Sequence, residues 1–181
     1  EAQRLVALIE DIIRLSRLDE CVRGEVTPVD LTALIQHCVQ KLTPAAQNAQ
    51  VSISASGNDP VLISGDHALL EEMLTNLLEN GIKYNHAGGY VRARAEMADG
   101  HAVVTVADNG VGIAPEDQQR VFERFYRVDK SRSKQTGGTG LGLSIVKHGA
   151  QVHHAQIAMQ SALGEGTTIT LTFPAQSSGK K

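Results

Sequence analysis

The feature that most constrains the fold is a pair of alternating segments joined by a two-residue turn. YVRARAEMA (90–98) and HAVVTVAD (101–108) alternate between apolar and polar side chains as strands do. Asp99-Gly100 between them is a strong β-hairpin signal. Two further hairpins are predicted from short β-branched runs: VSISA (51–55) with PVLIS (60–64), and QIAMQS (156–161) with TTITLTF (167–173). Because strands joined by tight turns pair antiparallel, a doubly wound parallel fold is disfavoured.

Amphipathic helical patterns alternate with these hairpins. Asp30 is predicted to cap a helix that Pro44 then disturbs, and Asp66 is predicted to cap a second, strongly periodic helix. A short helix is expected near 115–125, and another begins at the glycine-rich stretch GGTGLGLS (137–144). The order predicts an α+β domain in which a layer of helices packs on a mixed or mostly antiparallel sheet.

Composition narrows the class of protein. The 181 residues are 41% hydrophobic and 20% charged, which is typical of one soluble globular domain with a fragment to spare. With no Trp, three Phe, three Tyr and a net charge of -3, the chain has little aromatic surface for stacking of bases and no overall attraction to a phosphate backbone, so nucleic acid is not expected as a partner. Cys21 and Cys38 are too few for a zinc site or a disulfide framework.

The opening segment, residues 1–20, carries leucines and isoleucines at three- and four-residue steps. This stripe suits the seam of a helical bundle, and it equally suits a surface helix docked on its own domain. No run approaches the roughly twenty apolar residues of a membrane span, and no secretory leader is present, so we expect a soluble piece.

Polar side chains share one face of the second helix, within TNLLENGIKYN (75–85). Asn76 and Asn80 are one turn apart, and Lys83 and Tyr84 continue the same edge, while leucines occupy the opposite face. A solvated face would explain any single asparagine. Two asparagines in register favour a binding edge, because asparagine is a poor residue for the middle of a helix.

The stretch DNGVGI (108–113) sets a carboxylate at the end of an apolar strand, followed by Gly110 and Gly112. A sharp turn would explain the glycines by itself. Alternatively, Asp108 accepts a hydrogen bond from the exocyclic amino group of a flat base, and the bare backbone lets that base approach. Both interpretations stay open on the sequence.

Six basic and two acidic residues lie between Arg120 and Lys134, ahead of the glycine-rich stretch. Such a charge run is usually solvated surface. This one leads into the start of a helix, where free N–H groups bind anions, so a phosphate clamp is predicted. A P-loop lysine and the strand of a dinucleotide-binding turn are both lacking.

In this order the four stretches resemble the N, G1, F and G2 boxes of the catalytic ATP-binding domain of bacterial sensor histidine kinases. The likeness covers about residues 23–175, and residues 124–154 look especially like the phosphate-responsive subgroup. Residues 1–22 are similar to the end of the dimerisation and phosphotransfer helix, and 176–181 would be a flexible tail. The resemblance implies the Bergerat ATP-binding fold, a two-layer α/β sandwich with helices packed on a mixed sheet.

The resemblance also implies ATP and Mg²⁺ as cofactors, with no side chain assigned as nucleophile or base. Asn80 would ligate Mg²⁺, Asn76 would line the triphosphate side, Lys83 and Tyr84 would contact phosphate and ribose, and Asp108 would accept the adenine amino hydrogen. The remaining positions carried over as nucleotide-binding are Gly110, Gly112, Ile113, Tyr126, Arg127, Arg132, Gly138, Thr139, Gly140, Leu141, Gly142 and Leu143.

The implied partners are a phosphoacceptor histidine on a separate helix and a response-regulator aspartate. The parent protein would be a homodimer in the bacterial cell membrane, with this domain in the cytoplasm. None of the seven histidines lies in the opening helix or in an acceptor-like context, so we expect ATP binding without self-phosphorylation. His153-His154 is interpreted as a polar turn and not as a metal site.

The chain departs from the family pattern at two places. Gly81 stands where the family usually has alanine, and His154-Ala155 replaces a glycine pair, so a different turn is expected there.

Three competing functions stay open beside the histidine kinase. The first is hydrolysis of ATP, whose enzymes on this fold carry a glutamate one turn before the metal-binding asparagine. Here that position is Asn76, which cannot act as a base and so favours the kinase. The second is an anti-sigma-factor-like Ser/Thr kinase, and the third is a vestigial nucleotide-binding module.

Overall fold

The computed structural model describes residues 25–128 and 140–174. The opening segment and the tail therefore lie outside the described residues. The elements, in chain order, are β1 (Val26–Asp30), α2 (Leu31–Asn48), β2 (Ser52–Ser56), β3 (Leu62–Asp66), α3 (His67–Lys83), β4 (Tyr90–Ala98), β5 (His101–Asp108), the 3₁₀ helix η1 (Arg120–Phe122), α5 (Gly142–Val152), β6 (Gln156–Ala162) and β7 (Gly166–Phe173).

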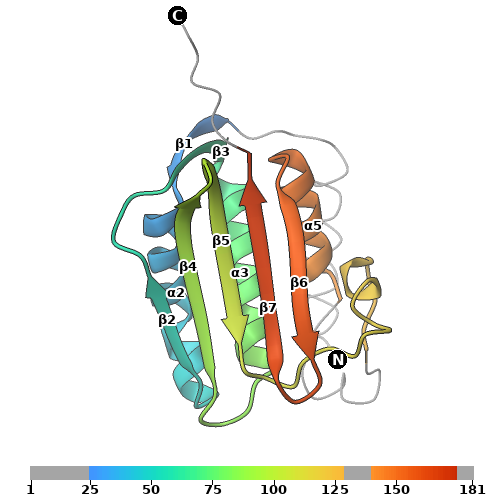
Figure 1. Cartoon of the computed structure of the whole chain (residues 1–181). Coiled ribbons are helices and arrows are strands. Elements are labelled where there is room, and N and C mark those ends of the chain that lie inside the picture. The colour runs from blue at the N-terminus through green and yellow to red at the C-terminus, as the bar shows by residue number, and fades with distance from the viewer. Residues whose placement is uncertain (1–24, 129–139, 175–181) are drawn as a thin grey trace, which may run out of the picture.

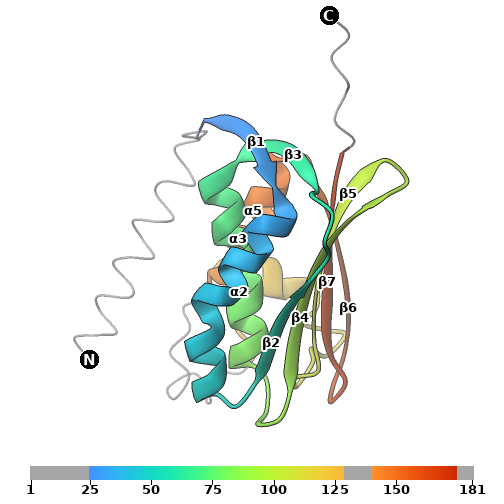
Figure 2. The same ribbon diagram turned by 90° about the vertical axis from the view of Figure 1, so that its left-hand side faces the viewer.

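A layer of helices covers one face of a five-stranded sheet (Figures 1 and 2). The strand order is β2-β4-β5-β7-β6, in which β2 runs parallel to β4 and every other pair is antiparallel. β1 and β3 form a separate antiparallel ribbon. The apolar faces of α2 and α3 are buried against the inward residues of β4, β5 and β7. The predicted α+β architecture with a mixed sheet is confirmed.

Both predicted aspartate caps are present. Oδ1 of Asp30 accepts hydrogen bonds from the N–H groups of Thr32 (3.0 Å) and Ala33 (3.4 Å) at the start of α2. Oδ1 of Asp66 accepts from the N–H of Leu69 (3.1 Å) at the start of α3. These bonds satisfy amide donors that have no partner inside a helix. Pro44 does not end α2, which continues to Asn48.

Two of the three predicted hairpins are confirmed, and one is wrong. β4 pairs with β5 and β6 pairs with β7, both antiparallel. β2 and β3, however, do not pair with each other: β2 joins the main sheet beside β4, and β3 pairs with β1. β1 was missed because Pro28 lies within it, and proline has no N–H to donate to a ladder.

Contacts with the start of α2 explain why the chain does not turn back after β2. The N–H of Val61 donates to Oδ1 of Asp30 (3.2 Å), and the N–H of Leu31 donates to the carbonyl of Val61 (2.8 Å). The hydroxyl of Thr32 donates to the carbonyl of Asp59 (2.8 Å). The segment between the two strands is therefore held at the helix start, and β3 is delivered to β1.

The helix expected near 115–125 is reduced to a series of turns and the 3₁₀ helix η1. Gln118 lies in the turns, and its side-chain amide donates to the carbonyls of Ile113 (3.1 Å) and Ser161 (2.8 Å). These bonds fix the segment to its neighbours. A helix of so few residues has little cooperative stability of its own, so such contacts decide its form.

His153 at the end of α5 has a structural role. It is buried, and its Nδ1 lies 2.7 Å from the carbonyl of Gly149 while its Nε2 accepts the N–H of Asp66 (3.0 Å). Its ring meets Phe173 edge-on. Within the described ranges, no group of three or more His, Cys, Asp or Glu could hold a metal ion.

The turn after α5 closes in the way a glycine turn would. The N–H of Ala155 donates to the carbonyl of Ala150 (2.8 Å), and that of His154 donates to the carbonyl of Gln151 (3.2 Å). This is the Schellman pattern, in which the residue after the helix is left-handed. His154 has φ 54°, so histidine here adopts the conformation that glycine favours.

Replacing His154 by glycine is expected to raise the free energy of unfolding by about 1 kcal/mol, because glycine adopts a left-handed backbone without the steric cost of a Cβ. Urea unfolding of His154→Gly, with His154→Ala as the matched variant, measures the difference. The glycine variant should be more stable than both the alanine variant and the parent. Equal stability of all three would show that the conformation carries no strain.

Candidate functional site

The candidate site lies at the end of the sheet where β5 ends, beside the last turns of α3 and the first turn of α5 (Figure 1). A Cβ added at Gly81 would lie 3.0 Å from both methyl carbons of Val91 and 3.6 Å from Cβ of Asp108. Gly81 therefore lets α3 approach the end of β5 closely. Asn80 directly precedes Gly81 in the chain, so Asn80 and Asp108 belong to the same end of the molecule.

The two asparagines of α3 face the start of α5. A Cβ on Gly142 would lie 2.9 Å from Oδ1 of Asn76 and 3.5 Å from Nδ2 of Asn80. Asn76 is oriented by its own Nδ2, which donates to the carbonyl of Glu72 (2.8 Å). Asn80 has no side-chain hydrogen bond within the described ranges. The two asparagines of the predicted polar edge therefore lie on one side of α3 and face a helix N-terminus.

The first turn of α5 has backbone donors to offer. Its N-cap is Leu141, whose side chain makes no capping hydrogen bond, so nearby N–H groups keep their capacity for an anion. The side chain of Leu141 is buried, and that of Leu143 is half-buried against the core. Only the backbone of these two residues is suited to contact a nucleotide.

Gly140, just before α5, lies close to Phe125 and Tyr126. It has φ 80°, and a Cβ there would lie 2.9 Å from the carbonyl carbon of Phe125 and from the carbonyl oxygen of Tyr126. Its own carbonyl accepts the N–H of Phe125 (3.0 Å). The approach of the two segments explains the need for glycine here. Arg132, Gly138 and Thr139 lie outside the described residues.

The charge of Arg127 acts on Lys83 near the end of α3. Lys83 is half-buried, and burial lowers its pKa, with the nearby charge of Arg127 adding to the effect and Glu79 opposing it. The ammonium also lies 5.4 Å from the centre of the Tyr84 ring. Like charges held together favour the binding of an anion between them. The predicted contact of Arg127 with phosphate stays a prediction.

Asp108 presents one occupied and one open oxygen. Oδ1 accepts the N–H of Gly110 (2.8 Å) and the N–H of Thr167 (3.3 Å). Oδ2 has no partner in the described part of the chain and is not sealed from solvent. Burial raises the pKa of Asp108, and the two backbone hydrogen bonds oppose that shift. The open oxygen is an acceptor held in a fixed direction.

The glycines after Asp108 are required by the backbone itself. A Cβ on Gly110 would overlap the carbonyl of Tyr84, which accepts the N–H of Val111 (2.9 Å). Gly112 has φ 69°, and a Cβ there would overlap the carbonyl of Ala162. The sharp-turn interpretation therefore accounts for both glycines. Their close approach to a base stays a prediction.

Tyr126 is held by a local cluster in the F-box segment. Its hydroxyl donates to Oδ1 of Asp117, and the guanidinium carbon of Arg120 lies 4.1 Å from the centre of its ring. The hydrogen bond to Asp117 is the main cause of its raised pKa. A direct contact of Tyr126 with nucleotide would compete with these partners, so its predicted role is the least supported by the geometry.

Sequence reasoning missed Ser161 and Thr167 beside the site. The hydroxyl of Ser161 accepts the N–H of Ile113 (2.8 Å), and it lies 2.9 Å from the hydroxyl of Thr167. Both are ordinary residues of alternating strands. The only local signal was a serine on the same face of β6 as Ile157 and Met159, where an apolar residue is expected.

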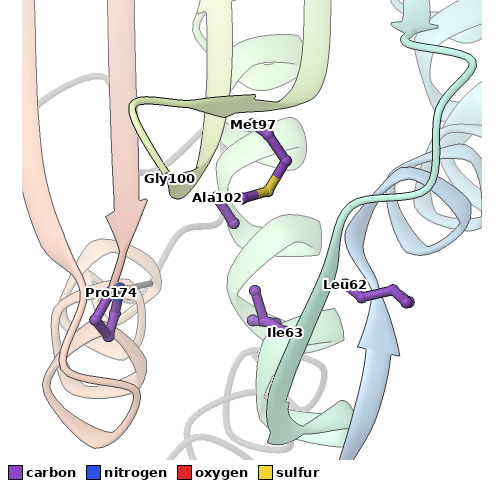
Figure 3. Close-up of a pocket in the computed structure, with 6 residues that line it drawn as sticks. All are labelled: Leu62, Ile63, Met97, Gly100, Ala102 and Pro174. Carbon is purple, nitrogen blue, oxygen red and sulfur yellow. The ribbon is translucent and has the colours of Figure 1, made fainter. Parts of the chain in front are cut away.

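A hollow of about 240 Å³ lies at the opposite end of the sheet (Figure 3). Its lining is Leu62, Ile63, Met97, Gly100, Ala102 and Pro174, with no ionisable side chain among them. Ala102 and Asp108 stand at opposite ends of β5. The hollow therefore has neither the position nor the chemistry of the candidate site.

No helix in the described ranges has both the length and the hydropathy needed to cross a bilayer.

Comparison with known proteins gives a family and several relatives. Residues 65–177 match the family described as "Histidine kinase-, DNA gyrase B-, and HSP90-like ATPase". The sensor-like histidine kinase SenX3 of Mycolicibacterium smegmatis is 42% identical over 175 residues, which are 96% of this chain and 46% of that protein. The phosphate regulon sensor protein PhoR of Pseudomonas aeruginosa is 38% identical over 97% of this chain and 40% of its own length.

A solved structure agrees with the family match. The crystal structure of full-length ShkA in complex with AMPPNP has a TM-score of 0.82 and 28% identity, over 94% of this chain and 35% of that chain. The fold expected from the four boxes is thereby confirmed. This chain spans less than half the length of these three relatives.

Proposed function

Because the chain belongs to the family of histidine kinase-, DNA gyrase B- and HSP90-like ATPases, we propose that it is the ATP-binding catalytic domain of a sensor histidine kinase. Its task would be to hold Mg-ATP so that the γ-phosphoryl group reaches a histidine on a separate helix. One observation carries the proposal: the open oxygen of Asp108, the asparagines of α3 and the first turn of α5 lie at one end of the fold.

Asp108 would recognise adenine. Its Oδ2 has no partner in the described residues and can accept a hydrogen bond from the exocyclic amino group, while Oδ1 stays bound to two backbone donors. Guanine carries a carbonyl at the corresponding ring position, and this carbonyl oxygen cannot donate a hydrogen bond to Oδ2 of Asp108, because both atoms are acceptors. The site should therefore prefer adenine nucleotides.

The triphosphate would lie between α3 and α5. Lys83, Arg127 and the N-terminus of α5 supply positive potential along this path. Positioning and neutralisation of charge are the main protein contributions to phosphoryl transfer, so this set of groups suits the reaction.

The residues present fit Mg²⁺ held jointly with phosphate. The described residues form no cage of carboxylates or histidines, and Asn80 has an amide with no internal partner. Mg²⁺ binds through few protein oxygens and keeps several waters, so one amide together with phosphate oxygens suffices. When bound, the ion would neutralise phosphate oxygens and orient them.

Transfer to protein is favoured over hydrolysis of ATP. Asn76 occupies the position one turn before Asn80, and its amide cannot take a proton from water. In the proposed reaction the bond between the γ-phosphorus and its bridging oxygen breaks, a P–N bond forms on the acceptor imidazole, ADP leaves, and the imidazole proton passes to solvent. The phosphoryl group would then move to an aspartate of a response regulator.

The proposed partners follow from this role. They are a phosphoacceptor helix, in the same or a partner subunit, and the receiver domain of a response regulator. We further propose a dimeric parent protein attached to the bacterial cell membrane, with this domain on the cytoplasmic side. Membership of the phosphate-responsive subgroup is the finer proposal for residues 124–154.

The test is transfer of labelled γ-phosphate. The chain should bind AMPPNP alone, and it should label a histidine only when the phosphoacceptor helices are supplied in trans. The label should be stable in base and labile in acid, and it should move to an aspartate when a receiver domain is added. Release of inorganic phosphate without labelled protein would indicate the hydrolase, and absence of AMPPNP binding would indicate a vestigial module.

A further inference from the structure

Ser161 lies at the end of β6, opposite Thr167 of β7. Its side chain is half-buried, on the face of the strand that carries Ile157 and Met159. The hydroxyl accepts the N–H of Ile113 (2.8 Å) and donates to the carbonyl of Gly166 (2.9 Å). A third contact, of 2.9 Å, joins it to the hydroxyl of Thr167.

These three contacts use the full capacity of the Ser161 hydroxyl. A hydroxyl has one hydrogen to donate and two lone pairs to accept. The hydrogen is used by the carbonyl of Gly166, and the N–H of Ile113 occupies one lone pair. The Thr167 hydroxyl must therefore donate to the second lone pair. An apolar side chain of this size could make none of these three hydrogen bonds.

The network continues to Asp108. The N–H of Thr167 donates to Oδ1 of Asp108 (3.3 Å), and the N–H of Gly110 donates to the same oxygen (2.8 Å). The loop from Asp108 to Ile113 is thus tied to the β6–β7 hairpin at both of its ends. The direction of the open Oδ2 depends on these ties, because rotation of the carboxylate would break both bonds to Oδ1.

The side chain of Gln118 makes a second connection between the loop and β6. Its Nε2 donates to the carbonyls of Ile113 (3.1 Å) and Ser161 (2.8 Å), so the two residues are bridged through backbone as well as through the serine hydroxyl. The remaining bridge should preserve the loop in outline when the hydroxyl is removed. What would be lost is the connection from the N–H of Ile113 through the Ser161 hydroxyl to the side chain of Thr167.

We propose that Ser161 is a positioning residue for base recognition, which acts through Thr167 and the Asp108–Ile113 loop without touching the nucleotide. The inference rests on the proposed adenine site. It predicts that the Ser161 hydroxyl sets affinity and selectivity for the base and has no effect on the phosphate side of the site.

Ser161→Ala is expected to weaken binding of Mg-AMPPNP about tenfold and to reduce its preference over the guanine analogue GMPPNP by a similar factor. Binding of inorganic tripolyphosphate should stay unchanged. Ser161→Thr, which keeps a hydroxyl on a strand that tolerates β-branching, should restore both affinity and preference. Ser54→Ala, the same change at an exposed position of β2, is the control and should have no effect.

Calorimetry of the full chain with these probes separates the outcomes. If the parent chain binds AMPPNP and Ser161→Ala keeps its affinity and preference, the positioning role is wrong. An equal loss of AMPPNP and tripolyphosphate binding would also overturn it, because a general structural defect does not discriminate. If Ser161→Ala does not fold, a folded Ser161→Thr variant without base preference refutes the proposal. Failure of the parent chain to bind AMPPNP would remove the proposed function itself.

Discussion

Asp108→Asn is expected to weaken binding of ATP analogues about 100-fold and to abolish the preference for adenine over guanine. Asparagine can keep its Oδ1 on the N–H groups of Gly110 and Thr167, so the loop is preserved. Its NH₂ group then replaces the open Oδ2 and sets a donor against the adenine amino group. Loss of such a bond, with donors left unpaired, costs about 3 kcal/mol, which corresponds to about 100-fold in the dissociation constant.

The same substitution should not reduce stability at neutral pH. Burial raises the pKa of Asp108 above its ordinary value of 3.8, so the native state holds this proton to higher pH than the unfolded chain does. Stability therefore falls as pH rises from the ordinary value through the raised one, and ionised Asp108 remains a cost at pH 7. Asp108→Asn lacks that cost, so its stability relative to the parent should be greater at pH 7 than below pH 3.8.

Isothermal titration with AMPPNP and GMPPNP, together with urea unfolding at several pH values, tests both effects. Asp59→Asn makes the same chemical change at an exposed side chain and is the matched control. An Asp108→Asn variant that still preferred the adenine analogue would falsify the assignment of Asp108 to the base. Loss of fold in this variant would show that the charge itself holds the loop.

Asn80→Ala is expected to raise the dissociation constant of Mg-AMPPNP by about 100-fold, while binding measured without Mg²⁺ changes little. The amide of Asn80 has no internal partner in the described residues, so its removal breaks no bond of the fold. Alanine is the better helix former by roughly 0.5 kcal/mol, so α3 should be at least as stable. The difference between titrations with and without Mg²⁺ gives the part of the binding free energy that depends on the metal.

Gln40→Ala provides the control for Asn80, because it makes a similar change from an amide to alanine at an exposed position of a different helix, α2. It should bind Mg-AMPPNP like the parent chain. If Asn80→Ala lost affinity equally with and without Mg²⁺, its amide would contact the nucleotide and not the metal. Normal Mg-AMPPNP affinity in Asn80→Ala would remove it from the site.

Much of the fold could be predicted because its signals are local. The caps at Asp30 and Asp66 depend on bonds to backbone groups two or three residues away. The turn at Asp99 and Gly100 needs positive φ at both positions, and the structure has 50° and 79°. The facing of Asn76 and Asn80 follows from helical periodicity alone. Each of these features is decided within a few neighbouring residues.

The pairing of β2 and β3 could not be predicted in this way. From their sequences, the two strands could have paired with each other as a hairpin. They pair elsewhere because Asp30 and Thr32 bind the segment between them, from about thirty residues away in the chain. The candidate site shows the same limit. The sequence left open whether Gly110 serves a turn or a base, and the carbonyl of Tyr84, brought close only by packing, explains the glycine.

The sequence by itself determined which faces of the helices are apolar, where α2 and α3 begin, and which polar residues are available to a nucleotide, because periodicity and steric preference act over short stretches of chain. Only the tertiary structure decided which strands pair and which oxygen of Asp108 is open. It also placed Ser161 in the network that orients that carboxylate. These outcomes depend on competition among partners distant in the chain, and a hydroxyl or a carboxylate has no preferred partner until folding brings one within reach.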